Sequence, residues 1–144
     1  MFMVQVSSSK YPYKILMKYT FDRILSCDFE EAEKRITMAL ENEGFGILTE
    51  ISMHEVFSKK LRREIPRYKL LGACNPQFAF DAIKKEKDVG LLFPCKLSIQ
   101  YIEEKETRLV ALDPIIMFNQ VKNPALNCIR DEIRRKLEMA VNLA

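Results

Sequence analysis

The chain has 144 residues, of which 48% are hydrophobic and 30% charged, a balance typical of one globular domain. A formal net charge of +3 is too small to indicate nucleic acid or an anionic membrane as partner. No segment contains the roughly 18 consecutive apolar residues that span a bilayer. The four cysteines form no Cys-x-x-Cys pair. We therefore expect free thiols in a reducing, cytoplasmic location.

The first 16 residues differ from the rest of the chain. Met1 to Val6 is a short apolar start without the basic residues and longer apolar region of a secretory signal. Met17 is a candidate natural start. We predict an N-terminal extension over 1–16 and a single domain over 17–144.

Periodicity predicts alternating strands and helices along the domain. Strands are expected at 18–25, 45–52, 68–74, 91–102 and 107–112. Helices are expected from 28 to 43, 53 to 64 and 76 to 87, with a short helix after Asp113-Pro114 and a last, strongly amphipathic helix after Asn123-Pro124.

Three details of these elements can be checked directly. Alternation places Ile47, Thr49 and Ile51 on one face of the second strand. Pro94 cannot donate to a strand ladder, so it indicates an edge position or a bulge for the fourth strand. Phe78 and Phe80 cannot both face inward on one helix, and an exposed Phe80 would indicate a partner surface.

Several short motifs occur in a recognisable order: GFGILTEI at 44–51, YKLLGACNP at 68–76, GLLFPC at 90–95, and Asp113-Pro114. Together they resemble the bacterial and archaeal family called domain of unknown function 302, over about Met17 to the final helix. The resemblance implies an α+β fold similar to the TATA-binding protein: a curved antiparallel sheet of about five strands in the order β-α-β4-α, with helical insertions and a long C-terminal helix. It also implies a homodimer. No activity is established for the family, so no reaction is implied. Lys96 stands where members often have Asn.

The most suggestive chemistry lies at Cys74 and Cys95. Cys74 precedes Asn75-Pro76, a helix-start signal, and a helix N-terminus stabilises a thiolate. If the two strands are neighbours, both thiols could bind a soft metal or form a reversible disulfide. Cysteine is also a common buried residue that packs as a small hydrophobe. The candidate ligand-binding set is Cys74, Asn75, Pro76, Pro94, Cys95 and Lys96, with the two cysteines as candidate catalytic or metal-binding residues.

Three functions remain open on these residues. The first is a module that binds a small anionic ligand or a soft metal at the Cys74 turn and the Cys95 bulge. The second is a thiol redox or sulfur-transfer enzyme, and the third is a structural or interaction protein with inert cysteines. We expect a binding role rather than an enzyme, because no catalytic or cofactor motif is present. His54, the one histidine, has no metal-ligand spacing around it.

A basic stretch is the strongest signal for nucleic acid, but one aromatic residue, Tyr68, is too few for a stacking platform. We interpret it as a solvated face. Its members are Lys59, Lys60, Arg62, Arg63, Arg67 and Lys69.

Overall fold

The computed structural model describes residues 18–144, which form a five-stranded antiparallel sheet with helices packed on one face. The strands, in the spatial order β1-β5-β4-β3-β2, are β1 (Thr20–Leu25), β2 (Gly46–Ser52), β3 (Tyr68–Cys74), β4 (Cys95–Glu103) and β5 (Glu106–Leu112). The predicted α+β class, five-stranded sheet and long final helix are confirmed. The predicted extension over 1–16 lies outside the described residues.

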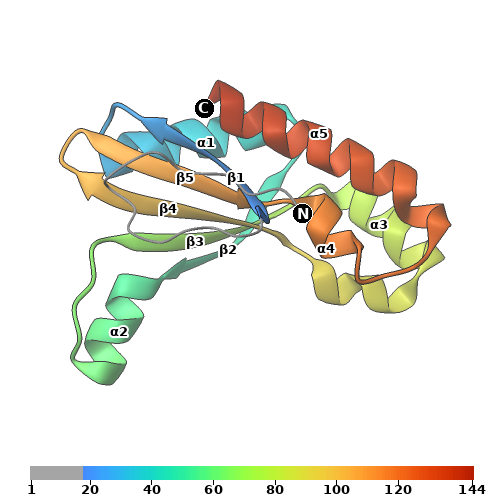
Figure 1. Cartoon of the computed structure of the whole chain (residues 1–144), viewed down its shortest axis with the longest axis horizontal. Coiled ribbons are helices and arrows are strands. Elements are labelled where there is room, and N and C mark those ends of the chain that lie inside the picture. Colours follow the sequence, from blue (N-terminus) through green and yellow to red (C-terminus); the bar gives the residue numbers. More distant parts are fainter. Residues whose placement is uncertain (1–17) are drawn as a thin grey trace.

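Two helices cover one face of the sheet and enclose the core. These are α1 (Phe29–Asn42), which contacts β4 and β5, and α5 (Asn127–Leu143), which contacts β1, β5 and α1 (Figure 1). The remaining helical segments are α2 (Met53–Leu61), α3 (Pro76–Lys85), η1 (Lys87–Leu92), α4 (Pro114–Phe118) and η2 (Pro124–Leu126). Within the described residues no helix is long and apolar enough to cross a membrane.

The ends of α1 follow from its sequence. The Asp28 carboxylate accepts a hydrogen bond from the backbone N–H of Glu31 (2.8 Å) at the start of the helix. Gly44 follows the last turn with φ +85°, where a side chain would be strained. The N–H groups of Gly44 and Phe45 then bond to the carbonyls of Glu41 and Leu40, closing a Schellman motif.

The predicted faces of β2 are wrong in part, because the strand contains a bulge. Ile47 pairs with Ala73 but Thr49 pairs with Gly72, so Leu48 stands outside the ladder. The extra residue reverses the alternation. Ile47 therefore shares the helix-covered face with Ala73, whereas Thr49 and Ile51 lie on the other face.

Pro94 indicated an edge position or a bulge for the fourth strand, and neither is found there, because β4 is an inner strand whose pairing with β3 is regular from Cys95 onward. β4 lies in the middle of the sheet, between β3 and β5. Pro94 is compatible with this because the strand begins one residue later, at Cys95, and residues 87–92 form η1 instead of extending the strand. The Phe93–Pro94 peptide bond is cis. Proline's missing donor therefore stays outside the ladder.

The contact around Gly72 holds β2, β3 and β4 at close range on the face opposite to α1 and α5. A Cβ at position 72 would overlap Oγ1 of Thr49 and lie 2.6 Å from Cγ of Pro94. Both are side-chain atoms, one on a β-branched residue and one in a proline ring, and such side chains have little freedom to move aside. Glycine is therefore required here by space, not by its backbone angles.

We predict that Gly72→Ala lowers the free energy of unfolding by about 1–3 kcal/mol, the usual cost of overpacking. Gly46→Ala is the matched control, because a Cβ there meets nothing within 4 Å and Gly46 also lies in a strand. Urea unfolding of both variants checks this. Equal midpoints for the two variants would contradict the crowding around Gly72.

Candidate functional site

The two cysteines of the predicted site lie on neighbouring strands. Cys95 is paired with Ala73 and shares its face, under the helices, where only 4% of Cys95 is exposed. Cys74 follows Ala73 at the end of β3 and pairs with Gly46, so strand alternation places it on the opposite face. All four cysteines are free thiols. The two strands are thus adjacent, as the metal and disulfide hypotheses required. The two cysteines, however, lie on opposite faces of the sheet.

The environment of both thiols disfavours the thiolate. Burial raises the pKa of the half-buried Cys74. Burial also raises the pKa of Cys95, to about 12, with Cys74 adding to the rise and Lys96 opposing it. A thiol with a raised pKa stays protonated at neutral pH and is a weak nucleophile. This is the opposite of the stabilisation that a helix start would provide.

The turn after Cys74 has a structural task in this fold. Asn75 precedes α3 but makes no side-chain cap there; its Nδ2 donates instead to the carbonyl of Glu43 at the end of α1 (3.3 Å). Pro76 takes the first helical position, as predicted. Beyond Cys95, the Lys96 ammonium is exposed and donates to the carbonyl of Pro94 (3.2 Å).

The described residues contain no group of three or more histidine, cysteine, aspartate or glutamate side chains that could hold a metal ion. His54 has a structural role, because its Nδ1 accepts a hydrogen bond from the backbone N–H of Tyr68 (3.1 Å). This bond attaches the first turn of α2 to the start of β3. No local pattern predicts this hydrogen bond, because it joins residues 14 positions apart.

A cavity of about 530 Å³ lies on the sheet face opposite to α1 and α5. Its lining comes from all the strands except β2, together with the residue before β1. The lining residues are Tyr19, Thr20, Tyr68, Leu70, Lys96, Leu97, Ser98, Gln100, Arg108, Val110 and Leu112. Of the predicted site residues, Lys96 alone takes part.

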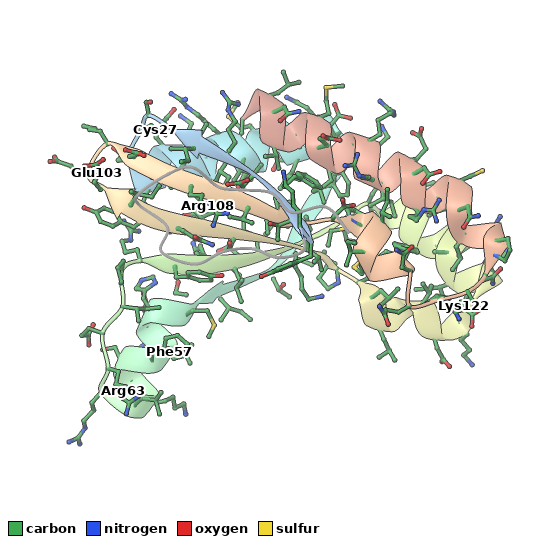
Figure 2. All side chains as sticks on the ribbon, viewed as in Figure 1. Cys27, Phe57, Arg63, Glu103, Arg108 and Lys122 are labelled. Atoms are coloured by element: carbon green, nitrogen blue, oxygen red, sulfur yellow. The ribbon has the colours of Figure 1, made fainter. Side chains whose placement is uncertain are left out.

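The polar side chains of Arg108, Gln100 and Ser98 line this cavity and are hydrogen-bonded to one another, and Arg108 is also bonded to Asp22 of β1, which lies outside the lining. Arg108 donates through Nε to the Asp22 carboxylate (2.9 Å) and through Nη1 to Oε1 of Gln100 (3.2 Å). The Gln100 amide then donates to the buried hydroxyl of Ser98 (2.9 Å). Figure 2 shows Arg108, which belongs to β5. The network holds these donors and acceptors in fixed orientations.

Sequence reasoning missed this cavity because its residues come from four separate segments. One signal was available: Lys96, Ser98 and Gln100 occupy every second position of an otherwise apolar run. That alternation marks a strand with one buried face and one polar face. A cysteine beside a helix start is a more familiar chemical pattern. It led to a site being predicted at the ends of the same strands, around Cys74 and Cys95.

The basic stretch divides into two parts in the structure. Arg67 pairs with Glu30 and lies over the Phe29 ring (4.1 Å), and Lys69 pairs with Glu33 and Glu50. The other four cations, Lys59, Lys60, Arg62 and Arg63, are exposed on α2 and just beyond it. The members of the stretch therefore differ in their surroundings, and the solvated face stays an interpretation.

The fold and the cavity define a class: an α+β domain with an antiparallel sheet whose one face is packed under helices and whose other face carries a polar cavity. Residues 21–144 match the family described as Domain of unknown function DUF302. The chain belongs to this family, as the motif order indicated.

A solved structure supports the family assignment. It is described as an uncharacterized conserved protein DUF302 from Bacillus stearothermophilus. The two share 26% sequence identity with a TM-score of 0.80, over 88% of this chain and 98% of that one. A comparison with curated proteins found no match.

We predict that native alkylation at pH 7 modifies the exposed Cys128 first and Cys74 more slowly, with Cys27 and Cys95 protected until the protein unfolds. Because the pKa of Cys95 is raised to about 12, its thiolate fraction grows only as the pH approaches that value. Peptide mass analysis after iodoacetamide pulses across pH measures each thiol separately. Fast modification of Cys74 or Cys95 near pH 7 would instead revive the thiol-enzyme hypothesis.

Proposed function

We propose that this protein is a cytoplasmic binding module for a small anionic ligand, and that the ligand lies in the sheet-face cavity. The observation that carries the proposal is the charge of the cavity. The described residues that line it include two cations, Lys96 and Arg108, and no carboxylate. Asp22 offsets Arg108 from the side, whereas within residues 18–144 the Lys96 ammonium donates a hydrogen bond to the Pro94 carbonyl alone.

The rest of the lining favours a ligand with an apolar portion. Leu70, Val110 and Leu112 supply an apolar surface, and Tyr19 and Tyr68 add aromatic rings with hydroxyl groups. A few fixed polar groups on an apolar surface are typical of small-molecule sites. A carboxylate or phosphate placed toward Lys96, with its carbon skeleton on the leucines, would use both kinds of surface.

The site predicted at the Cys74 turn and the cavity have one residue in common, Lys96. Lys96 and Pro94 belong to the predicted set, and Lys96 also lines the cavity. The thiols would then contribute packing rather than chemistry, because burial raises both of their pKa values. A soft metal remains the weaker alternative, since it would have to displace protons from thiols that hold them tightly.

We also propose that the protein is a homodimer. Large apolar side chains are exposed in groups on α2 and the neighbouring strand β2 and on α3 and η1. Exposed apolar patches of this kind mark interaction surfaces. Phe80, predicted to indicate a partner surface if exposed, is 60% exposed.

Thermal unfolding in the presence of inorganic phosphate and small mono- and dicarboxylates tests the binding proposal. A ligand that binds only the folded state, at ten times its Kd, is expected to raise Tm by roughly 3–6 °C. Lys96→Ala should abolish the shift in Tm, because it removes the cation. Since the Lys96 side chain is exposed, the substitution removes no buried contact. Lys122→Ala is the control, since Lys122 is exposed and lies away from the cavity (Figure 2).

The shift should also fall with added sodium chloride, because screening weakens an exposed ionic contact. An equal shift in wild type and Lys96→Ala would place the bound anion elsewhere. Absence of any shift across the set would contradict an anionic ligand of this size. Adding Zn²⁺ in a parallel series separates the soft-metal alternative, which predicts a rise that Lys96→Ala leaves intact.

A further inference from the structure

α2 is a helix with no buried residue, and it projects from the β2 edge of the sheet away from α1 and α5 (Figure 1). Its apolar residues Val56 and Leu61 are 38% and 58% exposed, and Ile51 of the adjoining strand is 45% exposed. An isolated helix of nine residues is marginal in water, so most of its stability must come from packing. Within the described chain α2 has few contacts, chiefly with β3.

A groove of about 390 Å³ runs between α2 and the outer edge of β2. Ile51 and Val56 give it an apolar centre. Its complete lining is Glu50, Ile51, Ser52, Glu55, Val56, Lys59 and Lys60. We call this set the α2 surface.

The charges of the α2 surface are ordered along the chain. The carboxylates of Glu50 and Glu55 come first, and the ammonium groups of Lys59 and Lys60 come last. A two-fold axis through the middle of such a segment places a second copy antiparallel to the first. The acidic end of each copy then meets the basic end of the other, and Ile51 and Val56 meet at the centre. The surface is therefore complementary to itself.

We propose that the α2 surface is the interface with a second copy of this chain. The inference rests on the homodimer proposed above and assigns its surface. Side chains rather than strand pairing form the contact, because the bulge at Leu48 interrupts the regular edge of β2. Glu55 and Lys59 form an exposed ion pair (3.6 Å) within one helix. In the dimer this pair is replaced by ion pairs between the two copies.

The other exposed apolar patch fits a second copy less well. Phe80 on α3 is already covered in part by Lys84, whose Nζ lies 5.3 Å from the ring centroid. Leu91 in η1 is 86% exposed but is not part of the groove. This patch provides the matched control for the α2 surface.

Sedimentation equilibrium of wild type, Val56→Asp and Leu91→Asp tests the assignment, with circular dichroism to show that each variant is folded. We expect a dimer for wild type and Leu91→Asp, and for Val56→Asp a dimer Kd raised at least tenfold. A monomeric wild type would overturn the homodimer proposal together with this inference. A dimeric wild type with an unchanged Val56→Asp would overturn the inference alone.

A charge exchange tests the two-fold arrangement itself. Glu55→Lys and the double variant Lys59→Glu, Lys60→Glu should each dimerise weakly, because like charges then face one another. Mixing the two should restore a mixed dimer, in which position 55 of each copy again faces charges of opposite sign at positions 59 and 60 of the other. Failure of the mixture to associate more tightly than either variant alone would contradict this arrangement.

Discussion

The close packing around Gly72 is the constraint on which one end of the sheet depends. Thr49 approaches position 72 from β2, and Pro94 approaches it from just before the start of β4, so neither leaves room for a side chain. These three residues lie in three of the motifs that place the chain in its family. The motifs thus describe one packing unit rather than three separate features. The constraint also fixes where β4 begins, because Pro94 must stand beside Gly72 while Cys95 starts the ladder.

The two faces of the sheet carry different tasks. α1 and α5 bury one face in a core that includes Ile36, Ile99 and Leu137. The opposite face presents polar side chains from alternate positions of the same strands, linked from Asp22 through Arg108 to Gln100. Burial of the first face stabilises the strands strongly enough for the second to hold charged groups. A rigid strand framework then orients the groups proposed to receive a ligand.

Local sequence signals predicted most of the strands and helices, whereas the antiparallel α+β arrangement was expected from the family resemblance. The errors have identifiable causes. Asp28 and Gly44 were sufficient to place the ends of α1, because capping is a local interaction. The faces of β2 could not be predicted, since the bulge at Leu48 depends on the partner strand. The central position of β4 depends on the order of the strands in the sheet. A local sequence pattern identifies a strand but does not show which strands lie beside it. The cavity was missed for the same reason: its residues meet only after the strands are assembled, whereas Cys74 and Asn75 are neighbours in sequence.

The bond from Asn75 to the Glu43 carbonyl joins the end of α1 to the start of α3. A Cβ at Gly44 would lie 3.0 Å from the same amide nitrogen, so the left-handed glycine and the asparagine occupy one shared space. Positions 44 and 75 are 31 residues apart, yet a larger residue at the first requires a smaller or displaced one at the second. Among related sequences these two positions should therefore vary together, and a chain that loses one of them should lose the other.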